Sequence, residues 1–180
     1  MASEDPQHRP PTSPLRRSEW SAKDNLKRIL WGLCRPFWWA IPLARPPLIR
    51  IFGGGVGRRV TIADRVAVEI PWNIEIGDRV RIEAGAILYS LGPITIDDDA
   101  VIDRGAHLCA GSHDHTDPGF SLLRTPIHVG RACIVGAESF VAPGVELGDG
   151  VSVAPRAVVV KSVRAGVAVG GNPAREESTG

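Results

Sequence analysis

Aliphatic residues recur at every sixth position over most of the chain. They fall into runs, which are Ile62, Val68 and Ile74; Ile76, Ile82 and Leu88; Ile96, Ile102 and Leu108; and Val129, Val135, Val141, Leu147, Val153 and Val159. A helix has a period of 3.6 and an extended strand a period of two, so neither gives a repeat of six. Short strands joined by tight corners do give it. The pattern therefore predicts a solenoid in which three hexads form one triangular coil and the aliphatic side chains point inward.

A second class of position supports this prediction. Four residues after most of the aliphatic positions the side chain is small or β-branched, at Val80, Ala86, Ala100, Ala106, Ser112, Cys133, Ser139, Val145, Val151, Ala157 and Val163. Glycine often follows an aliphatic position directly, at Gly77, Gly130, Gly136 and Gly148, and we assign these residues to the corners. The period slips by two residues between Ile74 and Ile76 and again between Leu88 and Ile96. We interpret both slips as small insertions at corners.

The repeat stops at the segment GSHDHTDPGFSLLRTP, residues 111 to 126. Two histidines, His113 and His115, stand there among Asp114 and other polar residues. We expect residues 114 to 126 to form a loop that leaves the prism and folds over a cleft.

Composition narrows the classes of protein. A chain of 180 residues is long enough for one well-packed domain, and a net charge of +1 gives no general reason to expect a nucleic acid partner. Cys34, Cys109 and Cys133 are odd in number and lie far apart, which argues against a disulfide framework and against a zinc knuckle. They indicate a reducing compartment, so we expect a cytoplasmic protein.

The N-terminal part of the chain differs from the repeat. Residues 1 to 17 are polar and rich in proline, which predicts a disordered leader without a signal peptide. Residues 18 to 59 form an aromatic and basic arm. Within it, Ser21 and Asp24 resemble a helix cap, the aliphatic residues from Leu26 to Leu33 have helical spacing, and Pro36 predicts the end of the helix.

Two roles for this arm remain open. It can pack on the first coil as an aromatic cap that shields the open end of the solenoid. Its mixture of tryptophan with lysine and arginine also suits the surface of a membrane, which permits peripheral contact with the inner face of the membrane. No apolar run in the sequence reaches the ~18 residues needed to span a bilayer.

Several motifs resemble those of a known family. IGDRVRIEAG at 76 to 85, VGAESFVAPGVELGDG at 135 to 150 and GGNPAR at 170 to 175 are similar to hexapeptide-repeat acyltransferases. PWN at 71 to 73 and LCAGSHD at 108 to 114 resemble the colanic-acid-type branch of the galactoside, maltose and xenobiotic acetyltransferase group. The resemblance implies an all-β fold, a left-handed parallel β-helix over residues 60 to 175, followed by a tail at 176 to 180.

The resemblance also implies an activity. Such a protein would be a homotrimer with active sites in the clefts between neighbouring prisms, and it would move an acetyl group from acetyl-CoA to a hydroxyl of a carbohydrate without a metal. The attacking hydroxyl must lose its proton, which suits an imidazole as general base. His113 matches the family's catalytic histidine, and Asp114 is a candidate for orienting its ring.

The binding residues come from the resemblance alone. Ala137 and Pro155 would line the pantetheine of coenzyme A, and Lys161 and Arg175 would meet its phosphates or adenosine. Glu83 and Ser90 are candidates for binding the acceptor sugar. The chain departs from the family at Ile134, where many relatives have tryptophan, and at VKS (160 to 162), where TKD is common.

Two other functions stay open. One is a non-catalytic scaffold or binding subunit that keeps the solenoid without turnover. The other is a zinc enzyme of the γ-carbonic-anhydrase kind, which would need three histidines from the set His107, His113, His115 and His128 to converge between subunits. The spacing of these histidines does not resemble that of the zinc family.

Overall fold

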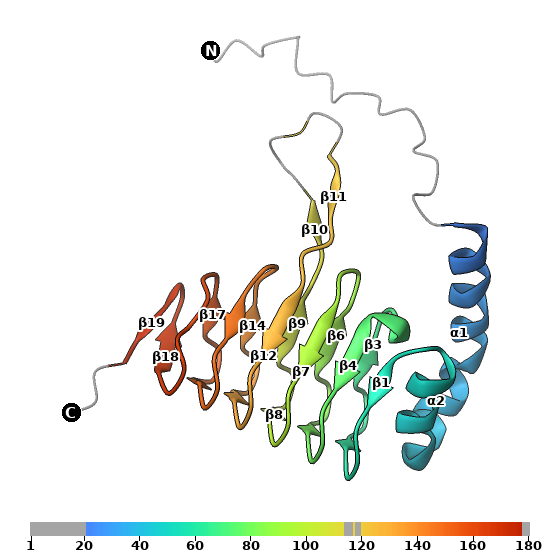
Figure 1. The fold of residues 1–180 in the computed structure, drawn as a ribbon, viewed down its shortest axis with the longest axis horizontal. Coiled ribbons are helices and arrows are strands. Elements are labelled where there is room, and N and C mark those ends of the chain that lie inside the picture. Colours follow the sequence, from blue (N-terminus) through green and yellow to red (C-terminus); the bar gives the residue numbers. More distant parts are fainter. Residues whose placement is uncertain (1–20, 114–116, 118–119, 178–180) are drawn as a thin grey trace, which may run out of the picture.

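The computed structural model describes residues 21 to 113, 117 and 120 to 177. The leader predicted at 1 to 17 lies outside these residues, as do parts of the predicted loop and of the predicted tail. The described chain forms a three-sided solenoid with a pair of helices at its N-terminal end and a hairpin projecting from one edge (Figure 1).

Each side of the prism is a sheet of short parallel strands, and we call the sides faces A, B and C. Face A has five strands, β1 (Gly55–Val56), β4 (Ile74–Ile76), β7 (Ile94–Ile96), β12 (Ile127–Val129) and β15 (Glu146–Leu147). Face C also has five, β3 (Ala67–Val68), β6 (Ile87–Tyr89), β9 (His107–Cys109), β14 (Phe140–Val141) and β17 (Val158–Val159).

Face B has seven strands. They are β2 (Thr61–Ile62), β5 (Arg81–Ile82), β8 (Val101–Ile102), β13 (Ile134–Val135), β16 (Ser152–Val153), β18 (Ala168–Gly171) and β19 (Ala174–Glu176). The last strand, β19, is antiparallel to β18, whereas the others are parallel. The solenoid therefore begins at Gly55, before the predicted boundary at residue 60, and its last strand reaches Glu176.

The predicted inward positions form the core. Every aliphatic residue of the sixfold pattern is 5% exposed or less, and equivalent residues of successive coils lie in register, as Ile82 does with Ile102. Each coil covers the open edge of its neighbour, so the stability of the fold comes from stacking.

Both slips in the period are insertions at equivalent corners of consecutive coils, as predicted, because Val68 is in register with Leu88 and Ile76 with Ile96. Ile74 and Ile76 lie on the same strand, β4, and both point into the core. The extra residues precede them, in the 3-10 turn η2 (Pro71–Asn73). The second slip is a corner insertion as expected, because residues 90 to 93 precede β7.

Glycine at the corners mainly permits close approach between coils. A Cβ atom added to Gly77 would lie 2.7 Å from the backbone nitrogen of Asp98 in the next coil. The left-handed backbone positions are often occupied by other residues, such as Arg79 with φ of 58° and Asp99 with φ of 62°. Carboxylates join the corners, since Asp98 accepts a hydrogen bond of 2.7 Å from the backbone N–H of Asp78.

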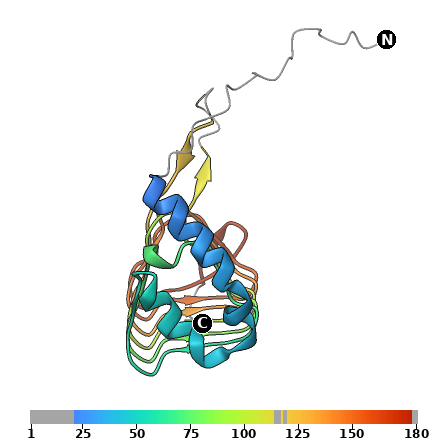
Figure 2. The same cartoon turned by 90° about the vertical axis from the view of Figure 1, so that its right-hand side faces the viewer.

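The arm caps the solenoid. Helix α1 (Ala22–Ala40), the 3-10 turn η1 (Pro42–Ala44) and helix α2 (Arg45–Ile51) lie across the end of the prism (Figure 2). The indole N–H groups of Trp31 and Trp38 donate to the carbonyl oxygens of Val68 and Val66 in the first coil. The buried Arg45 donates to the Ile62 carbonyl at 2.8 Å and to the Asp64 carboxylate at 3.1 Å.

The predicted end of the helix at Pro36 is wrong. Ser21 is the N-cap, as expected, but α1 continues through Pro36 to Ala40. Proline at this position removes a hydrogen bond to the carbonyl of Gly32, and Gly32 is exposed, so water can hydrate that carbonyl.

Among the described residues, no helix has the length and apolar character needed to cross a bilayer.

The buried Trp38 should contribute most to docking the arm. Replacing Trp38 by alanine removes a side chain that is 2% exposed together with its hydrogen bond, and should lower the free energy of unfolding by about 3 to 5 kcal/mol. The neighbouring Trp39 is 44% exposed, so Trp39→Ala should change it by only about 0.5 kcal/mol. Denaturant unfolding measures the free energy of unfolding of both variants. Equal decreases in the two variants would contradict the docking of the arm through Trp38.

Candidate active site

The hairpin leaves the prism at one edge. Strands β10 (Ser112–His113) and β11 (Leu122–Leu123) pair antiparallel, with His113 opposite Leu122. The hairpin edge is our name for the edge between faces C and A, formed by residues 69 to 73, 90 to 93, 110 to 113, 120 to 126, 142 to 145 and 160 to 162. Figure 1 shows the hairpin standing above the solenoid, midway between its ends.

His113 is held in a defined state on this hairpin. Its exposed ring stacks on Phe120, with centroids 4.9 Å apart and an interplanar angle of 19°. Its Nδ1 lies 3.0 Å from the carbonyl oxygen of Phe120. A carbonyl can only accept, so Nδ1 carries a hydrogen, and the tautomer with this hydrogen has its lone pair on Nε2. The imidazole is therefore arranged to accept a proton at Nε2.

In the described chain the carbonyl of Phe120 orients the imidazole of His113. Asp114 and His115 lie outside the described residues, so the structure says nothing about them. Sequence reasoning missed Phe120 because the partner is a backbone oxygen, and any residue type could supply it. An aromatic ring in the interrupted segment was the only signal.

The register of the coils places several side chains along the hairpin edge. Val68, Leu88 and Leu108 are stacked in face C, and the residues that follow them are Glu69, Tyr89 and Cys109. Val141 and Val159 continue the same ladder, so Lys161 lies just beyond it on this edge.

Lys161 and Arg175 come together near the C-terminal end of the prism. Both line a cavity of about 300 Å³ that is also bounded by Ser162 and Val169. Two cations beside one cavity suit the phosphates of a nucleotide. The structure thus brings together two of the residues that resemblance assigned to coenzyme A.

Other predicted residues lie on a different edge. Ala137 and Pro155 belong to consecutive coils at the edge between faces B and C, where the N–H of Arg156 donates to the carbonyl of Ala137 at 2.8 Å. Glu83 is half-buried at the same edge, which we call the BC edge. Within one protomer these three residues are separated from His113 by the width of face C.

Ser90 has a structural position. It is fully buried, and its hydroxyl accepts from the Ile70 N–H at 2.8 Å and donates to the Ile70 carbonyl at 2.9 Å. Both bonds join two consecutive coils at the hairpin edge. Because the side chain is enclosed within the protomer, it does not face a place where a sugar could bind, and the expectation for Ser90 is corrected.

The remaining described histidines differ from His113. His128 is exposed on face A and its Nε2 lies 2.9 Å from Asp97. His107 lies on face C between the rings of Tyr89 and Phe140, its Nε2 is buried without a hydrogen-bond partner, and burial lowers the pKa of its imidazole. Within the described ranges, no three His, Cys, Asp or Glu side chains are grouped closely enough to hold a metal ion.

Known proteins share both the sequence and the fold. WcaF of Escherichia coli K12, which carries the name colanic acid biosynthesis acetyltransferase, is 39% identical over 149 residues, covering 76% of this chain and 82% of its own. A protein of Dictyostelium discoideum named as an acetyltransferase is 31% identical over 136 residues, covering 74% of this chain and 72% of its own. No family model matches the sequence.

Solved structures agree with the architecture. A hexapeptide-repeat acetyltransferase of Vibrio cholerae, complexed with acetyl-CoA, has a TM-score of 0.82 and 24% identity, covering 88% of this chain and 89% of its own. A galactoside acetyltransferase in complex with coenzyme A has a TM-score of 0.79 and 20% identity, covering 89% and 84%.

The fold and the relatives define a class of enzyme, the acetyltransferases built on a left-handed parallel β-helix. Within this class, the chain belongs to the WcaF-type family of hexapeptide-repeat acetyltransferases.

Proposed function

We propose that the protein transfers an acetyl group from acetyl-CoA to a hydroxyl of a carbohydrate, with His113 as general base. The observation that carries this proposal is the tautomer of His113, fixed by the Phe120 carbonyl 3.0 Å from Nδ1. The relatives support the acceptor class, since one is named for biosynthesis of a polysaccharide and another for galactosides.

The reaction proceeds directly between two bound substrates. The sugar oxygen attacks the thioester carbonyl while its proton passes to Nε2 of His113. The tetrahedral intermediate then collapses, the carbon–sulfur bond breaks, and the departing sulfur takes the proton back from the imidazolium. No acetyl group is attached to the enzyme, and the histidine ends in its starting state.

The residues proposed to bind coenzyme A lie at both edges of face C. Lys161 and Arg175 line the cavity near one edge and would bind the phosphates or the adenosine. Ala137 and Pro155 lie at the BC edge and would line the pantetheine. A single protomer does not unite these residues with His113, whereas an assembly in which one hairpin edge meets the next protomer's BC edge would.

The outward residues of face C support such an assembly, a homotrimer. This row consists of Ala67, Ile87, His107, Phe140 and Val158. The corresponding row of face A is polar, with Glu75, Thr95, His128 and Glu146. Charged residues are depleted from the cores of interfaces, so face C is the side that three copies would bury. Glu83, at the BC edge, would then approach an acceptor held by the neighbouring His113.

Charges introduced on face C should prevent this assembly. Ile87→Glu and Phe140→Glu should shift the mass measured by light scattering from a trimer toward a monomer, because each would place a carboxylate in an apolar interface. Thr95→Glu on face A is the control and should leave the trimer intact. A monomeric parent protein, or dissociation by Thr95→Glu alone, would refute the proposal that face C forms the trimer interface.

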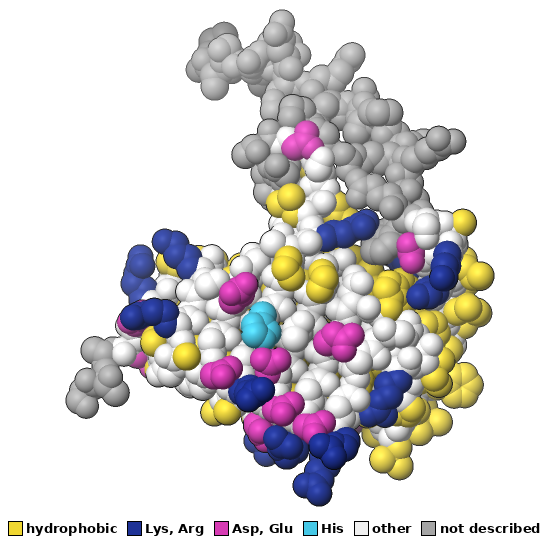
Figure 3. Space-filling view, in the orientation of Figure 1, with side chains coloured by type: hydrophobic (Ala, Val, Ile, Leu, Met, Phe, Trp, Pro, Cys, Tyr) yellow, Lys and Arg dark blue, Asp and Glu magenta, His cyan; other side chains and the backbone are white. Residues whose placement is uncertain are grey.

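We further propose a cytoplasmic enzyme in which α1 touches the membrane surface. The three cysteines are unpaired, which suits a reducing compartment. The face of α1 opposite Trp31 and Trp38 exposes Leu26, Ile29, Leu33 and Phe37 to solvent. Apolar side chains gather at the helical end of the molecule, whereas charged ones are spread over the solenoid (Figure 3). Lys23 is exposed on the same helix and suits anionic lipids.

Flotation with anionic liposomes tests the membrane contact. The parent protein should float, and the double variant Leu33→Glu, Phe37→Glu should remain at the bottom of the gradient, since its apolar face is interrupted by charge. The double variant Thr95→Glu, Ser152→Glu adds the same charge to the solenoid and should float like the parent. Equal flotation of both variants would eliminate this role for α1.

Acetyl transfer itself is tested through His113. Replacing His113 by alanine should lower the rate of coenzyme A release with the best sugar of a panel by ~10² to 10⁴, the usual contribution of a general base. His128→Ala removes an exposed imidazole on face A and should stay within a few-fold of the parent.

Three results would contradict the proposal. A His113→Ala rate within a few-fold of the parent would remove the assigned base. No turnover of any sugar by the parent would favour the non-catalytic scaffold. Stoichiometric zinc, with activity lost on chelation, would favour the zinc enzyme.

A further inference from the structure

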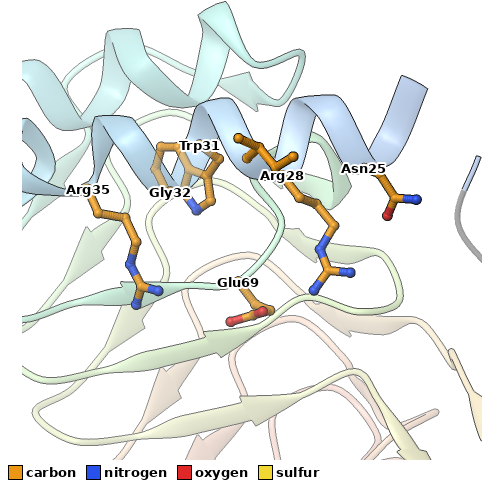
Figure 4. A pocket seen from close by; sticks show the side chains of 7 residues that line it. Asn25, Arg28, Trp31, Gly32, Arg35 and Glu69 are labelled. Atoms are coloured by element: carbon orange, nitrogen blue, oxygen red, sulfur yellow. The ribbon is translucent and has the colours of Figure 1, made fainter. Parts of the chain in front are cut away.

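A cavity lies between the capping helix and the first coil, away from the residues assigned to coenzyme A. It has a volume of about 450 Å³, within the range of pockets that hold small ligands. Asn25, Arg28, Trp31 and Arg35 of α1 line one side, and Glu69 of the first coil lines the other. Figure 4 shows both arginine side chains reaching from the helix toward the level of Glu69.

The charges in this cavity favour an anion. Arg28 and Arg35 are seven residues apart, about two helical turns, so they share one face of α1 and lie ~10 Å apart along its axis. Among the described residues, two arginines, Arg28 and Arg35, and one carboxylate, Glu69, line the cavity. Arg35 makes no hydrogen bond or ion pair with any residue of the described chain, and its guanidinium is therefore available to a ligand.

The cavity is electrostatically linked to the next coil. Burial raises the pKa of Tyr89, and the Glu69 carboxylate and Cys109 raise it further, while Arg28 acts in the opposite direction. Tyr89 therefore lies within the field of both charged groups. Tyr89 also stands next to Cys109 in the parallel ladder of β6 and β9.

The same edge leads from the cavity to His113. Glu69, Tyr89 and Cys109 follow equivalent ladder positions in three consecutive coils, and the hairpin strand with His113 begins three residues after Cys109. With coils ~4.8 Å apart, the cavity's coil and the hairpin's coil are separated by ~10 Å. A sugar reaching from the cavity along this edge would extend toward the proton acceptor.

We propose that this cavity binds an oxyanion carried by the acceptor, so that the substrate is a sugar bearing a phosphate or a carboxylate group. Arg28 and Arg35 bind the anionic oxygens, which guanidinium groups recognise through paired hydrogen bonds. Glu69 accepts a hydrogen bond from a sugar hydroxyl beside them. This inference rests on the proposed transfer to a carbohydrate and specifies the chemistry of the acceptor.

Binding to the full chain without acetyl-CoA tests the inference. Calorimetric titration with galactose 1-phosphate, glucuronate and neutral galactose compares ligands that differ in their anionic group. At least one of the two anionic sugars should bind more tightly than galactose. Arg28→Gln and Arg35→Gln should each weaken that binding by ~10-fold or more, because each removes a charge-assisted hydrogen bond to the anion. Lys23→Gln removes one positive charge from the same helix outside the cavity and should change nothing.

Further arms identify the site and the source of the anion. Arg28→Lys should recover part of the affinity lost in Arg28→Gln, and unchanged unfolding temperatures exclude loss of the cap as the cause. Adding sugar phosphate should reduce flotation with anionic vesicles equally, or not at all, in the parent and in Arg35→Gln. If sugar phosphate reduced flotation of the parent but not of Arg35→Gln, the cavity would be a site for a lipid headgroup. That result would overturn the assignment to the acceptor.

The inference fails if galactose binds as tightly as both anionic sugars, or if the arginine variants bind like the parent. It also fails if inorganic phosphate alone binds as tightly as the sugar phosphate, because the sugar would then contribute nothing. These outcomes are independent of turnover, so a failure here is distinguishable from a failure of the catalytic role of His113.

Discussion

The register in which successive coils stack is the constraint on which the site depends. Val68, Leu88, Leu108, Val141 and Val159 lie one above another in face C, so the residues that follow them are aligned along one edge. Shifting one coil by a single residue would turn its inward side chains outward. Burial of the aliphatic ladder therefore determines which polar residues reach the hairpin edge.

Much of the architecture follows from the sequence because the repeat has a simple physical cause. An aliphatic residue at every sixth position is what a three-sided prism requires, and those residues are buried as expected. The exceptions are local. In the sequence, Ile74 and Ile76 look like the end of one run and the start of the next, yet both belong to β4. The spacing of the aliphatic residues is the same whether the extra residues lie before Ile74 or after it, so the sequence does not locate the insertion. A proline usually ends a helix, but α1 continues through Pro36. Trp31 and Trp38 hold α1 against the first coil, and this tertiary packing outweighs the lost hydrogen bond.

The site was predictable only in part. The motif makes His113 a candidate base, and Lys161 and Arg175, far apart in sequence from His113, line one cavity. Ser90 could not be judged from sequence, since a serine at a corner can face solvent or bond to the adjacent coil, and here it bonds to Ile70. Phe120 acts through its backbone carbonyl, and the cavity lined by Arg28 and Arg35 depends on how the arm docks, so neither leaves a pattern in the sequence.

The central claim is that Nε2 of His113 faces the thioester while the Phe120 carbonyl holds Nδ1. A crystal structure of the full-length protein with coenzyme A tests it most directly. The account predicts that the thiol lies in a crevice between two protomers, near Nε2 of one His113, with the pantetheine against Ala137 and Pro155 of the adjoining protomer. A thiol placed far from every His113, or a His113 ring whose Nε2 donates to a protein carbonyl, would contradict it.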